Sequence, residues 1–151
     1  MHNICYTLIT GASEGFGKAL AIECGQRKMN LILVALPGPE LYTLANFITR
    51  NYCVDVVCIE KDLCRDESCL ELFNEVKALN LQVNMLINNA GIGSTVWFQE
   101  GTVTLYEKQI KLNVLATTLL TRLFLENLKR SCHSYILNIG SMASFFSLPK
   151  K

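Results

Sequence analysis

Short apolar runs alternate along the chain with longer stretches in which apolar residues recur at helical spacing. The runs are rich in Val, Ile and Leu, a composition typical of strands that are buried on both faces of a sheet. Strands are predicted at Ile4–Thr10, Asn30–Ala35, Val54–Ile59, Asn84–Asn88 and Tyr135–Ile139.

The stretches between these runs predict amphipathic helices, as where Phe73 and Val76 fall on one helical face. The longest predicted helix runs from about 103 to 129, and Thr104-x-x-Glu107 near its start has the pattern of a capping box. Because strands and helices alternate throughout, the sequence predicts a parallel sheet with right-handed crossovers. The predicted fold class is a doubly wound, three-layer α/β/α sheet, in one domain over residues 1–151.

Composition narrows the class of protein. Half of the 151 residues are hydrophobic and mean hydropathy is +0.27, which excludes a disordered chain. The 14 basic and 13 acidic side chains give a net charge of +1, so we expect no nucleic-acid partner. No apolar run approaches the roughly 20 residues of a membrane helix, so we expect no membrane partner.

The 7 cysteines point to a reducing compartment. Their number is odd, and none are spaced as Cys-x-x-Cys. With only His2 and His133 beside them, a zinc site of usual spacing cannot be written, and we expect no metal. The N-terminus has no basic region or cleavage-type residues of a targeting segment. We therefore predict a cytoplasmic protein whose cysteines are mostly small buried hydrophobes.

A glycine-rich turn follows the first predicted strand and opens the first helix. Residues 10–17 read Thr-Gly-Ala-Ser-Glu-Gly-Phe-Gly. At this place one glycine permits a tight turn, one lets the backbone approach a pyrophosphate, and one allows close packing of helix and strand. The new helix would direct its free amides at the phosphates. A plain structural turn is the alternative. The predicted cofactor contacts are Gly11, Ser13, Glu14, Gly15, Phe16 and Gly17.

The spacing Thr-Gly-x-x-x-Gly-x-Gly resembles that of the short-chain dehydrogenase/reductase family, whose sheet is of the Rossmann type. Further matches follow in the family's order and extend the resemblance over essentially the whole chain. They are Asp62-Leu63 after the third strand, Asn88-Asn89-Ala90-Gly91 after the fourth, Asn113 within the long helix, and Ser141 after the fifth strand.

The resemblance implies a hydride transfer between NAD or NADP and a small carbonyl or alcohol substrate. It implies that Asp62 and Leu63 hold the adenine ring, and that Asn89, Ala90 and Gly91 support the sheet and line the cofactor cleft. As catalytic residues it implies Ser141, which would bind the substrate oxygen, and Asn113, in a water-mediated proton relay. It also implies a homo-oligomer in the intact protein.

Three of these residues also have a structural explanation. Asp62 could cap a helix that begins near Asp66, Asn113 could be a solvated or locally bonded side chain, and Ser141 could merely shape a turn.

The choice between NAD and NADP is open in the sequence. A carboxylate near the end of the second strand favours NAD, and an arginine there favours NADP. The segment 34–38 reads Val-Ala-Leu-Pro-Gly and carries neither charge. Glu14 and Glu40 lie nearby in the sequence, but no position of theirs relative to the cofactor follows from it.

The family's Tyr-x-x-x-Lys motif does not occur in these residues. The tyrosines are 6, 42, 52, 106 and 135, and none has a lysine four positions later. Our first hypothesis is that the chain is the cofactor-binding part of an oxidoreductase, truncated to five of the family's seven strands and inactive alone. The second is a non-catalytic nucleotide-binding or interaction module. In either case we expect an uncovered apolar edge at the fifth strand.

Overall fold

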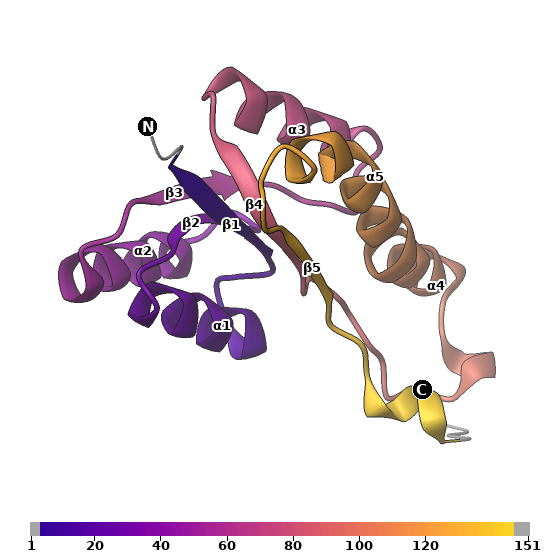
Figure 1. The fold of residues 1–151 in the computed structure, drawn as a ribbon. Coiled ribbons are helices and arrows are strands. Elements are labelled where there is room, and N and C mark those ends of the chain that lie inside the picture. The colour runs from indigo at the N-terminus through magenta and orange to yellow at the C-terminus, as the bar shows by residue number, and fades with distance from the viewer. Residues whose placement is uncertain (1–3, 147–151) are drawn as a thin grey trace.

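The computed structural model describes residues 4–146, so the amino-terminal segment with His2 lies outside the described residues. A five-stranded sheet with strand order β3-β2-β1-β4-β5 forms its centre, and every paired strand is parallel to its neighbour (Figure 1). The strands are β1 (Cys5–Thr10), β2 (Asn30–Ala35), β3 (Val56–Glu60), β4 (Gln82–Asn88) and β5 (Tyr135–Asn138). The doubly wound α/β class predicted from the sequence is confirmed.

Helices connect the strands and cover both faces of the sheet. The α-helices are α1 (Gly15–Gln26), α2 (Pro39–Tyr52), α3 (Ser68–Ala78), α4 (Val103–Ile110) and α5 (Thr117–Leu128). A π-helical segment, η2 (Lys111–Ala116), joins α4 to α5, and short 3-10 turns occur at η1 (Phe98–Glu100) and η3 (Met142–Phe145).

Two apolar cores lie on opposite faces of the sheet, and β2 supplies both. Its Leu31 and Leu33 pack with α1 and α2, whereas Ile32 and Val34 pack with α3 and α5. This division follows from the pleat, since successive side chains of a strand point to opposite faces. Figure 1 shows α1 and α2 below the sheet and α3 and α5 above it. The apolar run at 30–35 is therefore a strand covered on both sides.

The outer strand β5 differs from the prediction of strands that are buried on both faces. All four of its residues are exposed, because the sheet ends at β5 in the described part of the chain. Tyr135, Ile136 and Leu137 are 61%, 40% and 38% exposed, which agrees with the expected apolar edge.

The predicted start of the long helix, about residue 103, agrees with α4, but the predicted capping residue is wrong by two positions. Thr102, not Thr104, caps α4, and its Oγ1 accepts a hydrogen bond from Leu105 N at 3.1 Å. Thr104 lies inside the helix, so the pair Thr104 and Glu107 forms no capping box. The predicted helix is also not uniform, because the π segment interrupts it.

The cysteines are less buried than expected, although all seven lie among the described residues and none forms a disulfide. Cys24 and Cys69 are buried, three others are intermediate, and Cys53 and Cys132 are exposed. Within residues 4–146, no helix is long and apolar enough to cross a membrane.

Substitution of Phe124 tests the packing of the core on the face of the sheet covered by α3 and α5. Its side chain is fully buried and meets Phe73 edge-on at a centroid distance of 5.2 Å. We expect Phe124→Ala to lower the free energy of unfolding by about 3–5 kcal/mol, since it removes a large buried ring and leaves a cavity. Phe145→Ala is the control, because that ring is 83% exposed and its loss should change stability by less than about 0.5 kcal/mol. Urea denaturation measures both, and equal losses would contradict this packing.

Candidate cofactor-binding site

The chain crosses from one half of the sheet to the other after β3, so β1 and β4 lie side by side although far apart in sequence. In open α/β sheets, ligands bind outside the carboxyl ends of the strands at such a crossing point. The glycine-rich turn follows β1 there, and the Asn-Asn-Ala-Gly segment begins at the last residue of β4. The structure therefore brings these two predicted motifs together.

Two glycines of the turn are required by close contacts. A Cβ on Gly17 would lie 2.1 Å from the carbonyl oxygen of Gly11, so α1 can approach the turn only without a side chain there. Gly11 has a φ of +64°, and a Cβ on it would lie 2.9 Å from Ala90 Cα. These positions perform the packing and turning roles expected of the motif.

Gly15, in contrast, faces open space. Its φ is +53°, and among the described residues no atom beyond its chain neighbours and own helix would lie within 4 Å of a Cβ placed on it. It begins α1, and within residues 4–146 the preceding Glu14 side chain makes no capping hydrogen bond to this turn. The first amides of α1 therefore border a cradle that a bound group can enter.

Thr10 joins the ends of β1 and β4. Its buried Oγ1 accepts hydrogen bonds from Asn89 N and Ala90 N, both at 3.0 Å. Asn89 Nδ2 in turn donates to the carbonyl oxygens of Thr10 and Gly11, at 3.0 and 3.1 Å. Asn89 thus fixes the shape of the glycine turn. In the sequence Thr10 is only the first residue of the glycine motif, and its bonds to the segment after β4 were not predicted.

Asn113 lies in the π segment, where an extra residue per turn redirects side chains. Its Nδ2 donates to Ile92 O at 2.8 Å, and its Oδ1 accepts from Ile92 N at 2.9 Å. It therefore binds the backbone just after Gly91, whose Cβ would lie 3.2 Å from Asn113 Oδ1. Ile92 had no signal in the sequence, because only its backbone takes part.

Asp62 and Leu63 follow β3, next to β2 in the sheet. Asp62 caps no helix, since α3 begins only at Ser68; its Oδ1 accepts from Cys64 N at 2.9 Å. Burial raises the pKa of the Cys64 thiol, and the Asp62 carboxylate adds to the rise. The Leu63 side chain is 7% exposed and belongs to the core. A ligand at this place would meet Asp62 and the backbone of Leu63.

Ser141 follows β5 on an exposed segment. Its Oγ accepts from Ala143 N at 3.1 Å, so it caps the short turn η3 as the structural alternative expected. The strand before it is held more firmly, because Asn88 Nδ2 donates to Asn138 Oδ1 at 2.8 Å and Ile139 N donates to Asn88 O at 2.9 Å. None of the hydrogen bonds found within residues 4–146 links the Ser141 side chain to Asn113 or to the glycine turn.

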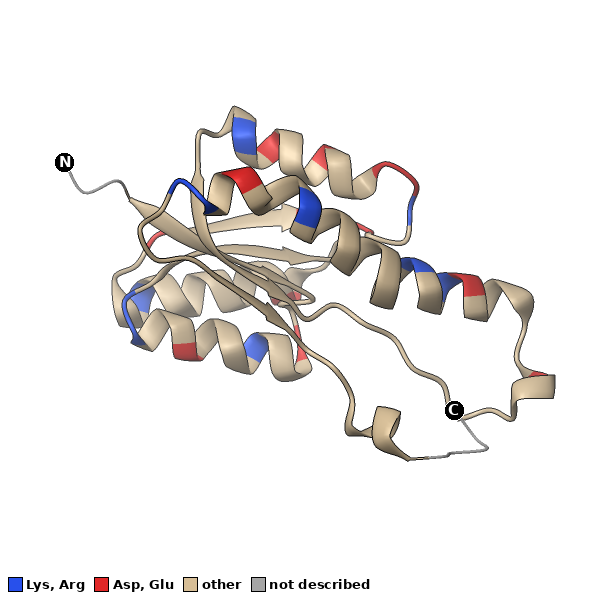
Figure 2. Ribbon diagram, turned by 45° about the vertical axis from the view of Figure 1, so that its right-hand side comes forward, with Lys and Arg blue, Asp and Glu red and all other residues tan. Residues whose placement is uncertain are grey.

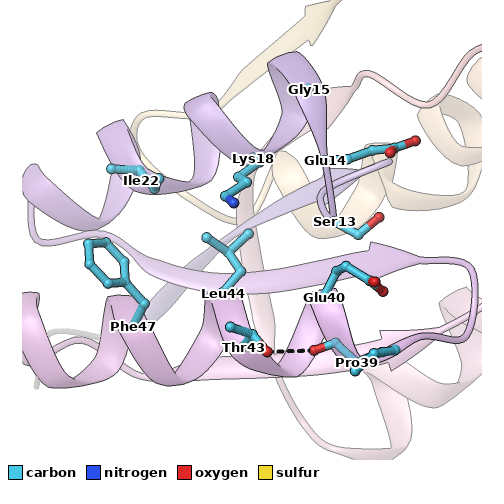
Figure 3. Close-up of a pocket in the computed structure, with 10 residues that line it drawn as sticks. All are labelled: Ser13, Glu14, Gly15, Lys18, Ile22, Pro39, Glu40, Thr43, Leu44 and Phe47. Carbon is cyan, nitrogen blue, oxygen red and sulfur yellow. Dashed lines mark hydrogen bonds between the residues drawn. The ribbon is translucent and has the colours of Figure 1, made fainter.

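A pocket of about 610 Å³ lies between α1 and α2, beside the glycine turn (Figure 3). Ser13, Glu14 and Glu40 line one end of it, Phe47 lines the other, and Lys18 and Leu44 lie between them. The sequence had given no reason to single out Lys18, Leu44 or Phe47, since their convergence depends on how two helices pack. Phe16, the remaining predicted contact, is 59% exposed.

The turn after β2 leads into Pro39 and Glu40, which line this pocket, and a carboxylate of β3 binds its backbone. Glu60 Oε1 accepts a hydrogen bond from Gly38 N at 3.3 Å. Partial burial and the neighbouring Glu60 carboxylate raise the pKa of the Tyr42 phenol. Figure 2 shows how the charged residues are distributed over the helices and turns. Among the described residues, no group of three or more His, Cys, Asp or Glu side chains could hold a metal ion.

Comparison with known proteins places this site in context. A family model described as short chain dehydrogenase matches residues 6–151. The 3-oxoacyl-[acyl-carrier-protein] reductase FabG of Aquifex aeolicus is 28% identical over 139 residues, covering 92% of this chain and 56% of the relative. The inactive hydroxysteroid dehydrogenase-like protein 1 of Danio rerio is 28% identical, covering 97% and 46%. The chain thus spans about half the length of these relatives.

Among solved structures, a short-chain dehydrogenase from Sphingobium yanoikuyae in complex with NADPH is similar, with a TM-score of 0.86. It is 31% identical to this chain, and the match covers 93% of this chain and 55% of the other.

Thr10→Val tests the junction of β1 and β4. Valine has nearly the same shape but no hydroxyl, so Asn89 N and Ala90 N would lose their buried acceptor. We expect the free energy of unfolding to fall by about 1–3 kcal/mol. The matched control is Thr118→Val, where an exposed hydroxyl donates to Val114 O, and the expected change is below about 0.5 kcal/mol. Thermal denaturation compares the two variants, and an unaffected Thr10→Val would contradict the role of this hydroxyl.

Proposed function

We propose that this chain, which belongs to the short chain dehydrogenase family, binds NAD or NADP as the cofactor-binding part of an oxidoreductase. The intact protein would transfer hydride between the nicotinamide and a small carbonyl or alcohol substrate. The observation that carries the proposal is the open cradle at Gly15, at the crossing point of the sheet. NADPH in the similar Sphingobium yanoikuyae dehydrogenase supports it.

The residues at the turn fit a dinucleotide. Gly15 leaves room for a pyrophosphate, and the helix α1 that begins there offers unpaired amides and the positive end of its dipole. Asn89 and Thr10 keep the turn in this shape through their mutual hydrogen bonds. Asp62, after β3, would accept hydrogen bonds from the adenine end of the cofactor.

The bound nicotinamide supplies or accepts the hydride. Ser141 Oγ accepts from Ala143 N, so its own O–H can donate to a substrate oxygen and orient it. Asn113 uses one N–H and one lone pair on Ile92. Its amide retains a second N–H and a second lone pair, with which it can hold a water for proton transfer. Both roles extend the family resemblance to these positions.

The proposal also covers the domain organisation, the cellular location and the oligomeric state of the protein. We take residues 1–151 as a dinucleotide-binding domain that corresponds to part of the family fold, with a homo-oligomer formed by the intact protein. A reducing, cytoplasmic location is supported by the lack of disulfides among the seven cysteines, all of which lie in described segments. A non-catalytic module is the second candidate, because one relative bears the name of an inactive dehydrogenase-like protein.

Gly17→Ala tests nucleotide binding. The new Cβ would displace the Gly11 carbonyl or α1, a strain of about 1–3 kcal/mol, which corresponds to a roughly 5- to 150-fold loss of NADH affinity. Gly140→Ala is the control, because no neighbouring atom among the described residues would lie within 4 Å of its Cβ, and it should bind NADH normally. Titration of NADH fluorescence measures the binding, with circular dichroism as the check on folding. If the unaltered chain binds neither NADH nor NADPH, the proposed function is wrong.

We also expect the 151-residue chain to bind the cofactor without turning over substrate. None of its tyrosines is followed by a lysine four residues later, so the general acid of the family motif is missing from these residues. The measurement is the absorbance of reduced nicotinamide with a panel of ketones and secondary alcohols. Hydride transfer by the purified chain would contradict this expectation.

A further inference from the structure

The turn after β2, residues 36–38, borders the place where a dinucleotide fold receives the ribose of the adenosine. Leu36, Pro37 and Gly38 have no charge of their own. Two carboxylates nevertheless reach this turn from outside it. Glu60, at the end of the neighbouring strand β3, accepts from Gly38 N, and Glu40 Oε2 lies 2.7 Å from the place of a Cβ on Gly38.

A third carboxylate, Glu14, comes from the glycine turn and lines a pocket together with Glu40. Glu14 and Glu40 line the same end of the α1–α2 pocket, with Ser13 between them (Figure 3). Both residues are exposed, so their side chains can turn toward a ligand. The carboxylates thus come from three different elements: the turn before α1, the first turn of α2, and the end of β3.

Lys18 is the opposing charge, and it lines the same pocket. In Figure 3 it extends toward Leu44, between the carboxylates of Glu14 and Glu40 and the ring of Phe47. The two pocket carboxylates outnumber this one ammonium, and Glu60 adds to the negative side close by. The end of the pocket that Glu14 and Glu40 line is therefore negative on balance.

We propose that this chain selects NAD over NADP, and that Glu14 and Glu40 determine the choice. The inference rests on the proposed function and makes it specific. A free 2′-hydroxyl can donate a hydrogen bond to either carboxylate, whereas a 2′-phosphate, with a charge of about −1.5 to −2 at pH 7, is repelled by both. The chain then differs in cofactor from the Sphingobium yanoikuyae dehydrogenase, whose structure contains NADPH.

Calorimetric titration of the 151-residue chain with NAD and with NADP tests the inference. We expect NAD to bind at least about tenfold more tightly at an ionic strength near 0.01 M, where repulsion is least screened. The double variant Glu14→Gln, Glu40→Gln keeps the shape of both side chains and removes both charges. It should bring the two affinities within about threefold of each other, mainly by strengthening NADP binding.

The matched control is Glu23→Gln, because Glu23 is an exposed carboxylate of α1 that pairs with Arg27 and does not line the pocket. It should leave the preference for NAD unchanged. Salt provides a second readout. Raising the ionic strength to about 1 M should reduce the preference for NAD if carboxylates repel the phosphate, and increase it if Lys18 attracts the phosphate.

The outcomes separate the two proposals. NADP binding as tight as NAD binding, a preference that survives the double variant, or a preference for NAD that grows with salt would each overturn the cofactor choice and leave the proposed function intact. Failure of both nucleotides to bind would overturn the proposed function, and the cofactor choice with it.

Discussion

The contact between the ends of β1 and β4 is the constraint on which the site depends. The Thr10 hydroxyl accepts from two backbone amides that follow β4, and the Asn89 amide returns two bonds to the turn that follows β1. Each partner is buried or half-buried, so these bonds are costly to leave unmade. The glycine turn is consequently shaped by a residue almost eighty positions away. Its geometry is fixed before any ligand arrives, which reduces the entropy lost on binding.

The sequence predicted the fold well because one physical rule governs it: a strand covered on both faces must be apolar at every position. That rule located β2 at its observed limits and the other strands within about two residues. The rule predicted wrongly that β5 is covered on both faces, since an apolar run does not show whether helices will pack against it. The cap at Thr102 was missed because Thr104 has the more complete capping pattern, and only tertiary packing decides where the chain enters the helix.

In the site, too, local features could be predicted from the sequence, whereas contacts between distant segments could not. Gly11 and Gly17 could be predicted in place and in their turning and packing roles, and Gly15 in place, because a short loop between a strand and a helix is a local structure. The partners of Asn113 and the pocket between α1 and α2 could not, since they arise where segments distant in sequence meet. Charge was hardest to predict. The segment after β2 is neutral in sequence, yet the Glu60 carboxylate binds its backbone and the Glu40 carboxylate lies close to Gly38.

The π segment at Lys111–Ala116 has a consequence for the surface of the long helix. A hydrogen bond from i to i+5 spans one residue more than an α-helical bond. The apolar residues before the π segment therefore do not lie on the same helical face as those after it. Beyond it, α5 buries Leu120, Phe124 and Leu128 on a single face. Before it, α4 buries no residue, and Val103 and Ile110 stand in solvent. The π segment therefore divides the helix into two parts. The second part, α5, packs in the core, and the first part, α4, extends from it into solvent.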